Sequence, residues 1–204
     1  MIKRLLDLTF LITGFLLVIP FLIFLLIFIV IFMIIEDGFP IFYTQNRYGE
    51  KKKLFKLYKF RSMIKNAELK TGPIWASKDD DPRLTKLGKF MRKYAIDEIP
   101  QLFNILKGDI SFVGPRPERP ELYDVFVIKN PRFVDRLNSP QGLTGLAQLL
   151  GKYDTSPKNK LRYDLIYTRN QSFLFDMKII FLSVLVTLIG NWQSDSRKWI
   201  RNFI

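Results

Sequence analysis

Two adjacent carboxylates and a rigidly held arginine are the residues of this chain most able to do chemistry. Asp97 and Glu98 stand together in the sequence IDEIP, and Arg116 follows in the sequence GPRP. Because Pro115 and Pro117 fix their own φ and restrict the residues before them, the guanidinium of Arg116 has little freedom left to lose. A rigid, planar cation suits a phosphate oxygen. The pattern therefore indicates chemistry on a phosphorylated substrate.

The composition narrows the kind of chemistry further. The chain contains no histidine and no cysteine, so it lacks the commonest general base and the commonest strong nucleophile. Covalent catalysis would have to use a carboxylate, a hydroxyl or a lysine. Without these ligands a zinc site is disfavoured, and an oxygen-ligated ion such as Mg²⁺ is the metal to expect. The absence of cysteine also fits a reducing compartment.

Length and charge indicate one compact domain with an anionic partner. The 204 residues include 32 Lys and Arg against 19 Asp and Glu, which gives a formal net charge of +13. Such a charge favours nucleic acid, anionic lipid or a phosphorylated small molecule, and does not choose among them.

The N-terminal segment predicts attachment to a membrane. Residues 8–35 carry no charge, and a helix of about 20 apolar residues is enough to cross the hydrocarbon core. Pro20 lies inside this run and favours a kink. Basic residues flank both ends, at Lys3 and Arg4 and again within 47–53, so both ends prefer the cytoplasmic side. We therefore expect a re-entrant helix that bends at Pro20, with a kinked single span as the alternative.

The segment that follows predicts a hairpin and an amphipathic helix. Alternating β-branched and aromatic residues over 39–44 and 53–60 surround a turn signal at 47–50, which is typical of a short hairpin. Apolar residues at helical spacing over 83–94 predict a basic amphipathic helix. Its cationic face could be solvated, rest on anionic headgroups or bind substrate.

The remainder of the chain predicts mostly helices. Asp97 is expected to cap a helix over 98–106, and 131–144, which contains two prolines and one asparagine, is expected to be a surface loop. Further helices are expected over 158–168 and 175–189. The apolar part of the last helix is short for a span, and should be buried or lie at a membrane interface.

Several motifs together resemble a known family. They are TQNRYG at 44–49, KLYKFRSM at 56–63, DPRLTKLGKFMRKYAIDEIPQLFNILKGDISFVGPRPERP at 81–120, GLTGLAQ at 142–148 and LRYDLIYTRNQSFLFDMKI at 161–179. In this order and at this spacing they closely resemble the bacterial sugar transferases of the small monotopic phosphoglycosyl transferase family. The resemblance covers nearly the whole chain.

The resemblance implies a reaction at the cytoplasmic face of the bacterial inner membrane. Such enzymes transfer a sugar 1-phosphate from a UDP-sugar to a polyprenyl phosphate such as undecaprenyl phosphate, and release UMP. It further implies that Asp97 is the nucleophile, which carries the phosphosugar as a covalent intermediate, and that Glu98 binds Mg²⁺. The product enters glycoconjugate synthesis, so downstream glycosyltransferases are possible partners.

Other site residues follow from matching positions. The resemblance implies that these residues bind substrate phosphates or line the site: Arg116, Arg83, Arg92, Lys59, Arg61 and Asp176, with Asp164 as a weaker candidate. For Lys59, Arg61 and Asp164, ion pairs that tie helices together remain an equal alternative. The chain departs from the family pattern at Ile19, before Pro20, where a serine is frequent, and at Lys152, where an arginine is frequent. Lys152 keeps the charge of a phosphate ligand but not the bidentate fork.

The fold class that follows is α+β and mostly helical. We expect a monotopic membrane protein with a re-entrant helix over residues 1–37 and a small cytoplasmic catalytic domain with interfacial helices over 38–204. Glu118, Arg119, Glu121 and the range 131–144 are the positions expected to bear on the choice of sugar.

Two other functions compete with this prediction. The first is an anchored protein that only binds lipid or a partner, for which Asp97 would be dispensable. The second is nucleic-acid binding, which the charge and the 15% of aromatic residues permit but no recognisable motif supports. We therefore expect no nucleic-acid partner.

Overall fold

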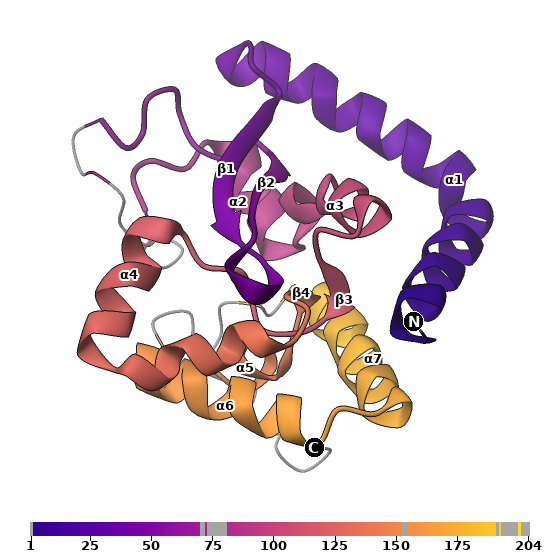
Figure 1. Cartoon of the computed structure of the whole chain (residues 1–204). Helices are drawn as coiled ribbons and strands as arrows, with labels where there is room; N and C mark the ends of the chain where they lie inside the picture. The colour runs from indigo at the N-terminus through magenta and orange to yellow at the C-terminus, as the bar shows by residue number, and fades with distance from the viewer. Residues whose placement is uncertain are drawn as a thin grey trace.

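The chain folds into helices packed around two small sheets (Figure 1). The structure, a computed structural model, describes residues 2–69, 72, 81–151, 155–190, 192 and 200, and the side chains of all of these except 2 and 15–22. Within that part most residues are helical and the strands are short, so the predicted α+β, mostly helical class is confirmed.

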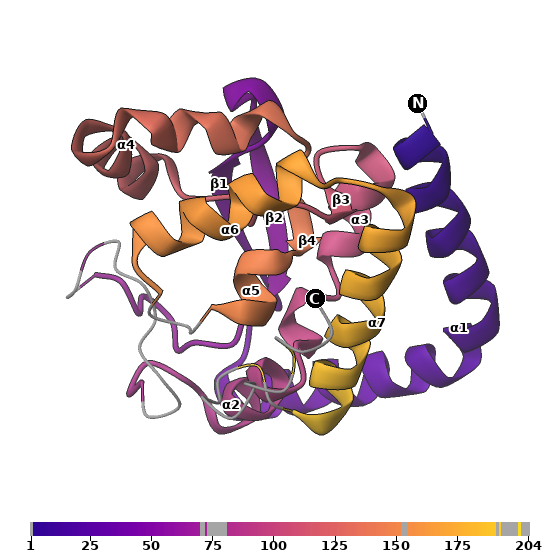
Figure 2. The ribbon, with the colours of Figure 1, turned by 90° about the horizontal axis from the view of Figure 1, so that it is seen from below.

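Both ends of the first helix contact the rest of the chain. Helix α1, Ile2–Asp37, is continuous, and Figures 1 and 2 show it bent into two arms. In the first arm, Lys3 forms an ion pair with Asp176. At the other end, the guanidinium of Arg61 donates to the carbonyl of Asp37 at 3.1 Å. Both ends of α1 therefore contact residues of 38–204.

Much of the described surface of α1 is apolar and exposed. Among the described residues, which exclude the side chains of 15–22, no helix is both long and apolar enough to cross a membrane. Many apolar side chains of α1 are exposed, including Phe24 at 76% and Ile35 at 74%.

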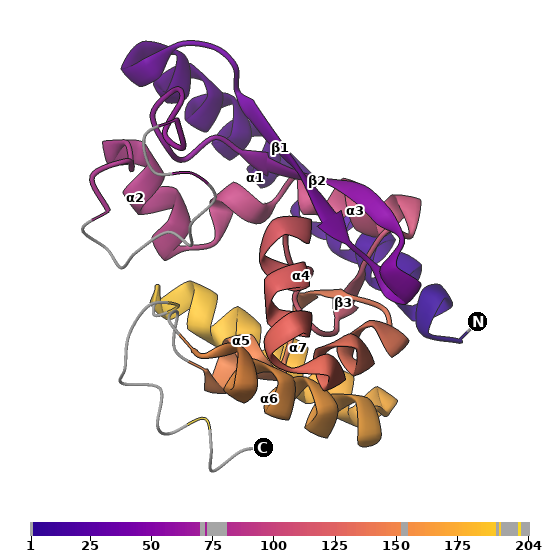
Figure 3. The same cartoon turned by 60° about the vertical axis from the view of Figure 1, so that its left-hand side comes forward.

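The predicted hairpin is present with a shifted turn. Strand β1, Phe42–Tyr48, pairs antiparallel with β2, Leu54–Phe60, and Figure 3 shows the hairpin between α1 and α4. The expected turn at 47–50 is wrong by several residues, because Arg47 pairs across the ladder with Phe55. The amide of Gly49 instead donates to the carbonyl of Lys53 at 2.8 Å and closes a 3₁₀ turn, Glu50–Lys52.

The basic helix starts later than its apolar spacing predicts. Helix α2 spans Lys86–Lys93, because the side chain of Thr85 caps it by accepting from the amide of Gly88. A Cβ added at Gly88 would lie 1.9 Å from the carbonyl oxygen of Ser62. Only glycine permits this approach, which brings α2 against the segment that follows β2.

A 3₁₀ turn and a short helix follow α2. The turn, η2, spans Ile96–Glu98, and α3 spans Gln101–Lys107. Pro100, rather than Asp97, is the N-cap of α3, so the predicted capping role of Asp97 is wrong. The physical reason is that Ala95 is left-handed, with φ of 52°, and reverses the chain into a separate 3₁₀ turn before α3 begins.

The second sheet carries the arginine loop. Strand β3, Ser111–Val113, pairs parallel with β4, Gly142–Thr144. Helix α4, Pro120–Lys129, lies between them in sequence. The loop expected at 131–144 is wrong, because Pro131–Asn138 forms a 3₁₀ helix, η3, that begins with Asn130 as its cap and buries Phe133 completely.

The C-terminal helices complete the core. Helix α5 spans Leu146–Leu150. Helices α6, Pro157–Arg169, and α7, Phe173–Ile189, confirm the two helices predicted over 158–168 and 175–189. One face of α7 is buried against β3 and α5 through Ile179, Leu182 and Val186. Its opposite face is apolar and exposed, with Leu188 at 72%.

Candidate active site

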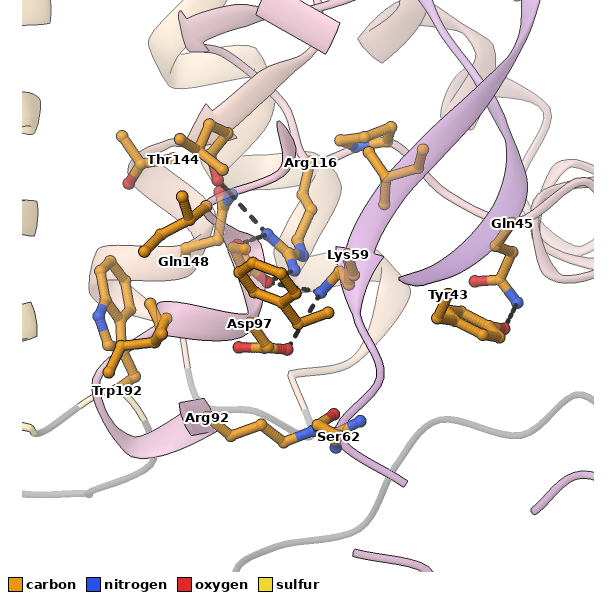
Figure 4. Close-up of a pocket in the computed structure, with 18 of the residues that line it drawn as sticks. Tyr43, Gln45, Lys59, Ser62, Arg92, Asp97, Arg116, Thr144, Gln148 and Trp192 are labelled. Atoms are coloured by element: carbon orange, nitrogen blue, oxygen red, sulfur yellow. Dashed lines mark hydrogen bonds and ion pairs between the residues drawn. The ribbon is translucent and has the colours of Figure 1, made fainter. Parts of the chain in front are cut away.

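One large cavity contains the acid pair. It has a volume of about 1200 Å³ and lies between the β1–β2 hairpin, η2, the loop after β3 and α7. Figure 4 shows Asp97 between Trp192, Thr144 and Gln148 on one side and Tyr43 and Gln45 on the other. Residues that line the cavity therefore lie on two sides of the carboxylate.

The two carboxylates have different surroundings. Asp97 is 4% exposed, and Oδ2 of Asp97 lies 3.9 Å from the ammonium of Lys59. Glu98 accepts from Lys59 at 2.7 Å through Oε1, and its two oxygens also accept from the guanidinium of Arg116. Two cations thus hold Glu98, and one of them is shared with Asp97.

Burial and charge push the pKa values of the pair in opposite directions. Burial raises the pKa of Asp97, and the attraction of Lys59 only partly offsets this. Burial would also raise the pKa of Glu98, but Arg116 and Lys59 outweigh it and hold that pKa well below its usual range. Burial lowers the pKa of Lys59. Two neighbouring carboxyls with separated pKa values are typical of a catalytic site.

A buried asparagine sets the distance between the hairpin and the acid pair. Asn104 of α3 is fully buried, accepts from the amide of Tyr58 at 3.1 Å, and donates to the carbonyl of Lys56 at 2.7 Å and to Asp109 at 3.0 Å. These bonds fix α3, and the turn before it, against β2. Lys59 follows in the same strand and is thereby placed beside Asp97.

A glycine contact places Arg116. A Cβ at Gly114 would lie 2.2 Å from the carbonyl oxygen of Pro140, so only glycine lets the end of β3 approach the chain before β4 this closely. The loop that follows carries Arg116, whose guanidinium also donates to the carbonyl of Leu143 at 3.4 Å. This loop connects β3, β4 and Glu98.

The two arginines of the motif around the basic helix, Arg83 and Arg92, lie in different surroundings. Arg92, in the last turn of α2, lines the cavity, and its Nε donates to Oγ of Ser62 at 2.9 Å. Arg83 is not among the residues that line the cavity. It precedes α2, and its guanidinium is bound to Asp81 through bonds of 2.9 and 2.6 Å. The structure thus brings Arg92, but not Arg83, to the acid pair.

Two further predicted residues have structural partners. Arg61 lines the cavity, but its guanidinium bonds the carbonyls of Asp37 and Gly38 at the end of α1. Asp176 lies outside the cavity, with Lys3 and the hydroxyl of Tyr167.

Two candidates remain. Asp164 accepts from Arg136 at 2.9 Å, an ion pair between α6 and η3 that is consistent with the tying role considered from sequence. Lys152 lies outside the described residues.

Sequence reasoning missed a second charged cluster in the cavity wall. Glu118, which is 4% exposed, accepts from Lys160 at 3.0 Å and lies 3.9 Å from Arg136. Arg136 also donates to the carbonyl of Arg116 at 2.8 Å and so supports the arginine loop. Arg47 donates to the carbonyl of Pro117 at 3.2 Å, and burial lowers its pKa to about 10.

This second cluster could be found only in part from the sequence. Arg47 lies in β1, Glu118 in the loop after β3, Arg136 in η3 and Lys160 in α6. These segments are far apart in the chain, and no spacing pattern links them. Of the positions expected to bear on sugar choice, Glu118 and Arg119 line the cavity and Glu121 does not. Within 131–144, Arg136, Leu143 and Thr144 reach it.

The acid pair fits only one mode of metal binding. Among the described residues no group of three or more acidic side chains gathers to enclose a metal. Mg²⁺ is often held by one or two carboxylates together with substrate phosphates and water. Asp97 and Glu98 supply this donor set, provided that Glu98 exchanges some of its contacts with Arg116 and Lys59.

Comparison with known proteins identifies the family. The α+β fold places a buried acid pair, two cations and a proline-bracketed arginine loop around one cavity. The profile of the family described as bacterial sugar transferase matches residues 1–190. The chain belongs to this family, and the transferase class predicted from its motifs is confirmed.

Individual relatives differ in length. The chain is 39% identical over 199 residues to the galactosyl transferase CpsE of Streptococcus agalactiae, covering 92% of the chain and 42% of the relative. It is 47% identical over 138 residues to a putative undecaprenyl-phosphate N-acetylgalactosaminyl 1-phosphate transferase of Bacillus subtilis, covering 68% and 74%. An undecaprenyl-phosphate galactose phosphotransferase of Salmonella typhimurium is 35% identical over 208 residues, covering 92% and 40%. The chain thus spans less than half of two of these relatives.

Proposed function

We propose that this protein transfers a sugar 1-phosphate from a UDP-sugar to undecaprenyl phosphate, giving an undecaprenyl diphosphate-linked sugar and UMP. The observation that carries the proposal is the buried carboxylate of Asp97, beside Glu98 and Lys59, in a cavity large enough for a nucleotide sugar. The names of the relatives from Bacillus and Salmonella support the acceptor and the phosphosugar.

The chemistry divides into two displacements at phosphorus. In the first, an oxygen of ionised Asp97 forms a bond to the phosphorus that bears the sugar, and the bond from that phosphorus to the UMP oxygen breaks, so UMP leaves with the electron pair. In the second, an oxygen of the lipid phosphate attacks the same phosphorus. The bond to Asp97 then breaks and the carboxylate is restored. Neither step needs a general base, which suits a chain without histidine.

The surrounding cations make the attack of an anion on an anionic diphosphate possible. Lys59 keeps part of Asp97 ionised, because its charge lowers the pKa that burial raises. Arg116 and Arg92 line the same cavity and can bind phosphate oxygens as charge develops on them. Mg²⁺, bound by Glu98 together with substrate phosphates, would supply additional neutralising charge.

We further propose that the protein lies on the cytoplasmic face of the bacterial inner membrane, with α1 as a re-entrant anchor. Support comes from Lys3 at one end of α1 and Asp37 at the other, since both contact residues of 38–204. A helix whose two ends contact the same part of the chain returns to the side it started from. The exposed apolar side chains of α1 would then face lipid.

The test is the identity of the nucleotide released. Detergent-solubilised protein with Mg²⁺ and undecaprenyl phosphate is offered a panel of UDP-sugars, with Asp97→Asn alongside. UMP release that is lost in the variant is expected. UDP release would indicate ordinary glycosyl transfer, and no release with any donor would favour a protein that only binds lipid or a partner.

A further inference from the structure

One part of the cavity wall combines apolar α7 side chains with an aromatic ring. Figure 4 shows Trp192 on the same side of Asp97 as Thr144 and Gln148. The α7 residues Val184 and Leu188 line the same cavity. The indole of Trp192 donates to Oγ1 of Thr187 at 2.9 Å, which fixes its ring against α7. This wall carries no charged side chain among the residues named, whereas the opposite wall contains Arg47, Glu118 and Arg119.

The apolar wall continues onto the outer surface of α7. Phe181, Val184 and Leu188 are spaced three and four residues apart, so they form one stripe along the helix. They are 63%, 50% and 72% exposed. Val184 and Leu188 line the cavity and Phe181 does not, so the stripe leads from the cavity to the outside. An exposed, continuous apolar track of this kind indicates an apolar ligand.

The charges at the inner end of the stripe identify the kind of ligand. The cavity that Leu188 lines also contains Arg92, Lys59 and Arg116 around the acid pair. A ligand that places an anionic group among these cations and an apolar chain along α7 would match both surfaces. A nucleotide sugar has no such chain, and an ordinary peptide has no phosphate.

We propose that Val184, Leu188 and Trp192 bind the first isoprene units of the polyprenyl phosphate acceptor, while the opposite, charged wall takes the soluble donor. This inference rests on the proposed function and adds the location of the acceptor. Asp97 lies between the two walls (Figure 4), so the phosphosugar formed on it from the donor side is exposed to the lipid phosphate on the other.

The test separates the two displacements and uses a matched pair of leucines. Leu188→Ser changes the cavity wall. Leu174→Ser changes a leucine of the same helix with almost the same exposure, 73% against 72%, that does not line the cavity. The first displacement is measured as a burst of UMP from a UDP-sugar without acceptor. The second is measured as the KM for undecaprenyl phosphate in steady-state turnover.

We expect Leu188→Ser to keep the UMP burst and to raise the KM for undecaprenyl phosphate about tenfold, the effect of losing one apolar side-chain contact. Leu174→Ser should change neither. An unchanged KM in Leu188→Ser, or an equal rise in both variants, would overturn the inference while leaving the proposed function standing. A wild-type protein that releases no UMP from any donor would overturn both.

Discussion

The ammonium of Lys59 lies 3.9 Å from Oδ2 of Asp97, and the same ammonium donates to Glu98 at 2.7 Å. Strand β2 therefore supplies the charge that both members of the acid pair share. The charge of Lys59 lowers the pKa of Asp97, and burial opposes this effect by raising the same pKa. The balance between burial and the charge of Lys59 sets the fraction of Asp97 that is ionised, the form that the proposed reaction requires.

Removal of the Lys59 charge should shift the pH dependence of turnover. Because this charge lowers the pKa of Asp97, Lys59→Met should raise that pKa further and move the acid limb of the kcat profile to higher pH. The plateau should fall by about 10²-fold, the usual cost of losing one preorganised charge. Lys59→Arg keeps the charge and should leave the limb near its wild-type position. Coincident profiles for Lys59→Met and the wild type would contradict this assignment.

Replacement of the proposed nucleophile, Asp97, should separate activity from stability. The pKa of Asp97 in the folded chain is raised above its ordinary value of 3.8. Ionisation of Asp97 therefore destabilises the folded state, and this loss of stability develops as the pH rises from 3.8 through the folded-state pKa. Asp97→Asn cannot ionise. Its free energy of unfolding should equal or exceed that of the wild type at neutral pH, and the difference should shrink as pH falls through the same window.

Denaturant unfolding over a series of pH values measures this difference. Asp124→Asn is the control, because the side chain of Asp124 is 54% exposed and pairs only with exposed Lys52 among the contacts described; both activity and stability should be kept. A large loss of stability in Asp97→Asn at neutral pH would indicate that Asp97 serves the fold instead of the reaction.

The approach of α2 to the cavity should depend on Gly88. In Gly88→Ala the added methyl would meet the carbonyl of Ser62 at 1.9 Å, so α2 must move and carry Arg92 with it. We expect a loss of about 1–3 kcal/mol in the free energy of unfolding and a raised KM for the donor. The matched change Gly14→Ala, in α1, meets nothing within 4 Å and should be neutral or stabilising. Equal thermal unfolding of both variants would contradict the predicted contact.

Asp176 should act on the N-terminal arm of α1 more than on the reaction. Asp176 pairs with Lys3 and accepts from Tyr167, whose hydroxyl also lies 3.2 Å from the carbonyl of Val113 in β3. Asp176→Asn should therefore speed hydrogen exchange in the first turns of α1, because that arm loses an anchor. The UMP burst should persist. A complete loss of the burst with unchanged exchange would instead place Asp176 in the chemistry.

The sequence predicted the acid pair and its cations where a local signal or a family motif fixes them. Pro115 and Pro117 hold Arg116, and the match to KLYKFRSM indicated Lys59. The same motif logic grouped Arg83 with Arg92, but Arg83 precedes α2 and binds Asp81. Spacing along the chain cannot show which of two arginines precedes the helix cap and which lies within the helix.

Other features depend on contacts between distant segments. Arg136 lies in a stretch whose two prolines suggest a loop, yet Phe133 and Arg136 are almost fully buried there. The buried charge of Arg136 is balanced by Asp164, in α6, and no pattern in the sequence links the two residues. The capping role expected of Asp97 failed for a similar reason, because the left-handed Ala95 separates the 3₁₀ turn from α3.

The central claim is that Asp97 carries the phosphosugar, and intact-protein mass spectrometry tests it most directly. The protein is incubated with Mg²⁺ and a UDP-sugar that it turns over, without undecaprenyl phosphate, and is then acid-quenched. We predict a mass increase of one sugar phosphate that is absent in Asp97→Asn and disappears when undecaprenyl phosphate is added before the quench. Turnover of the donor with no adduct at any time, or an adduct that persists in Asp97→Asn, would contradict the account.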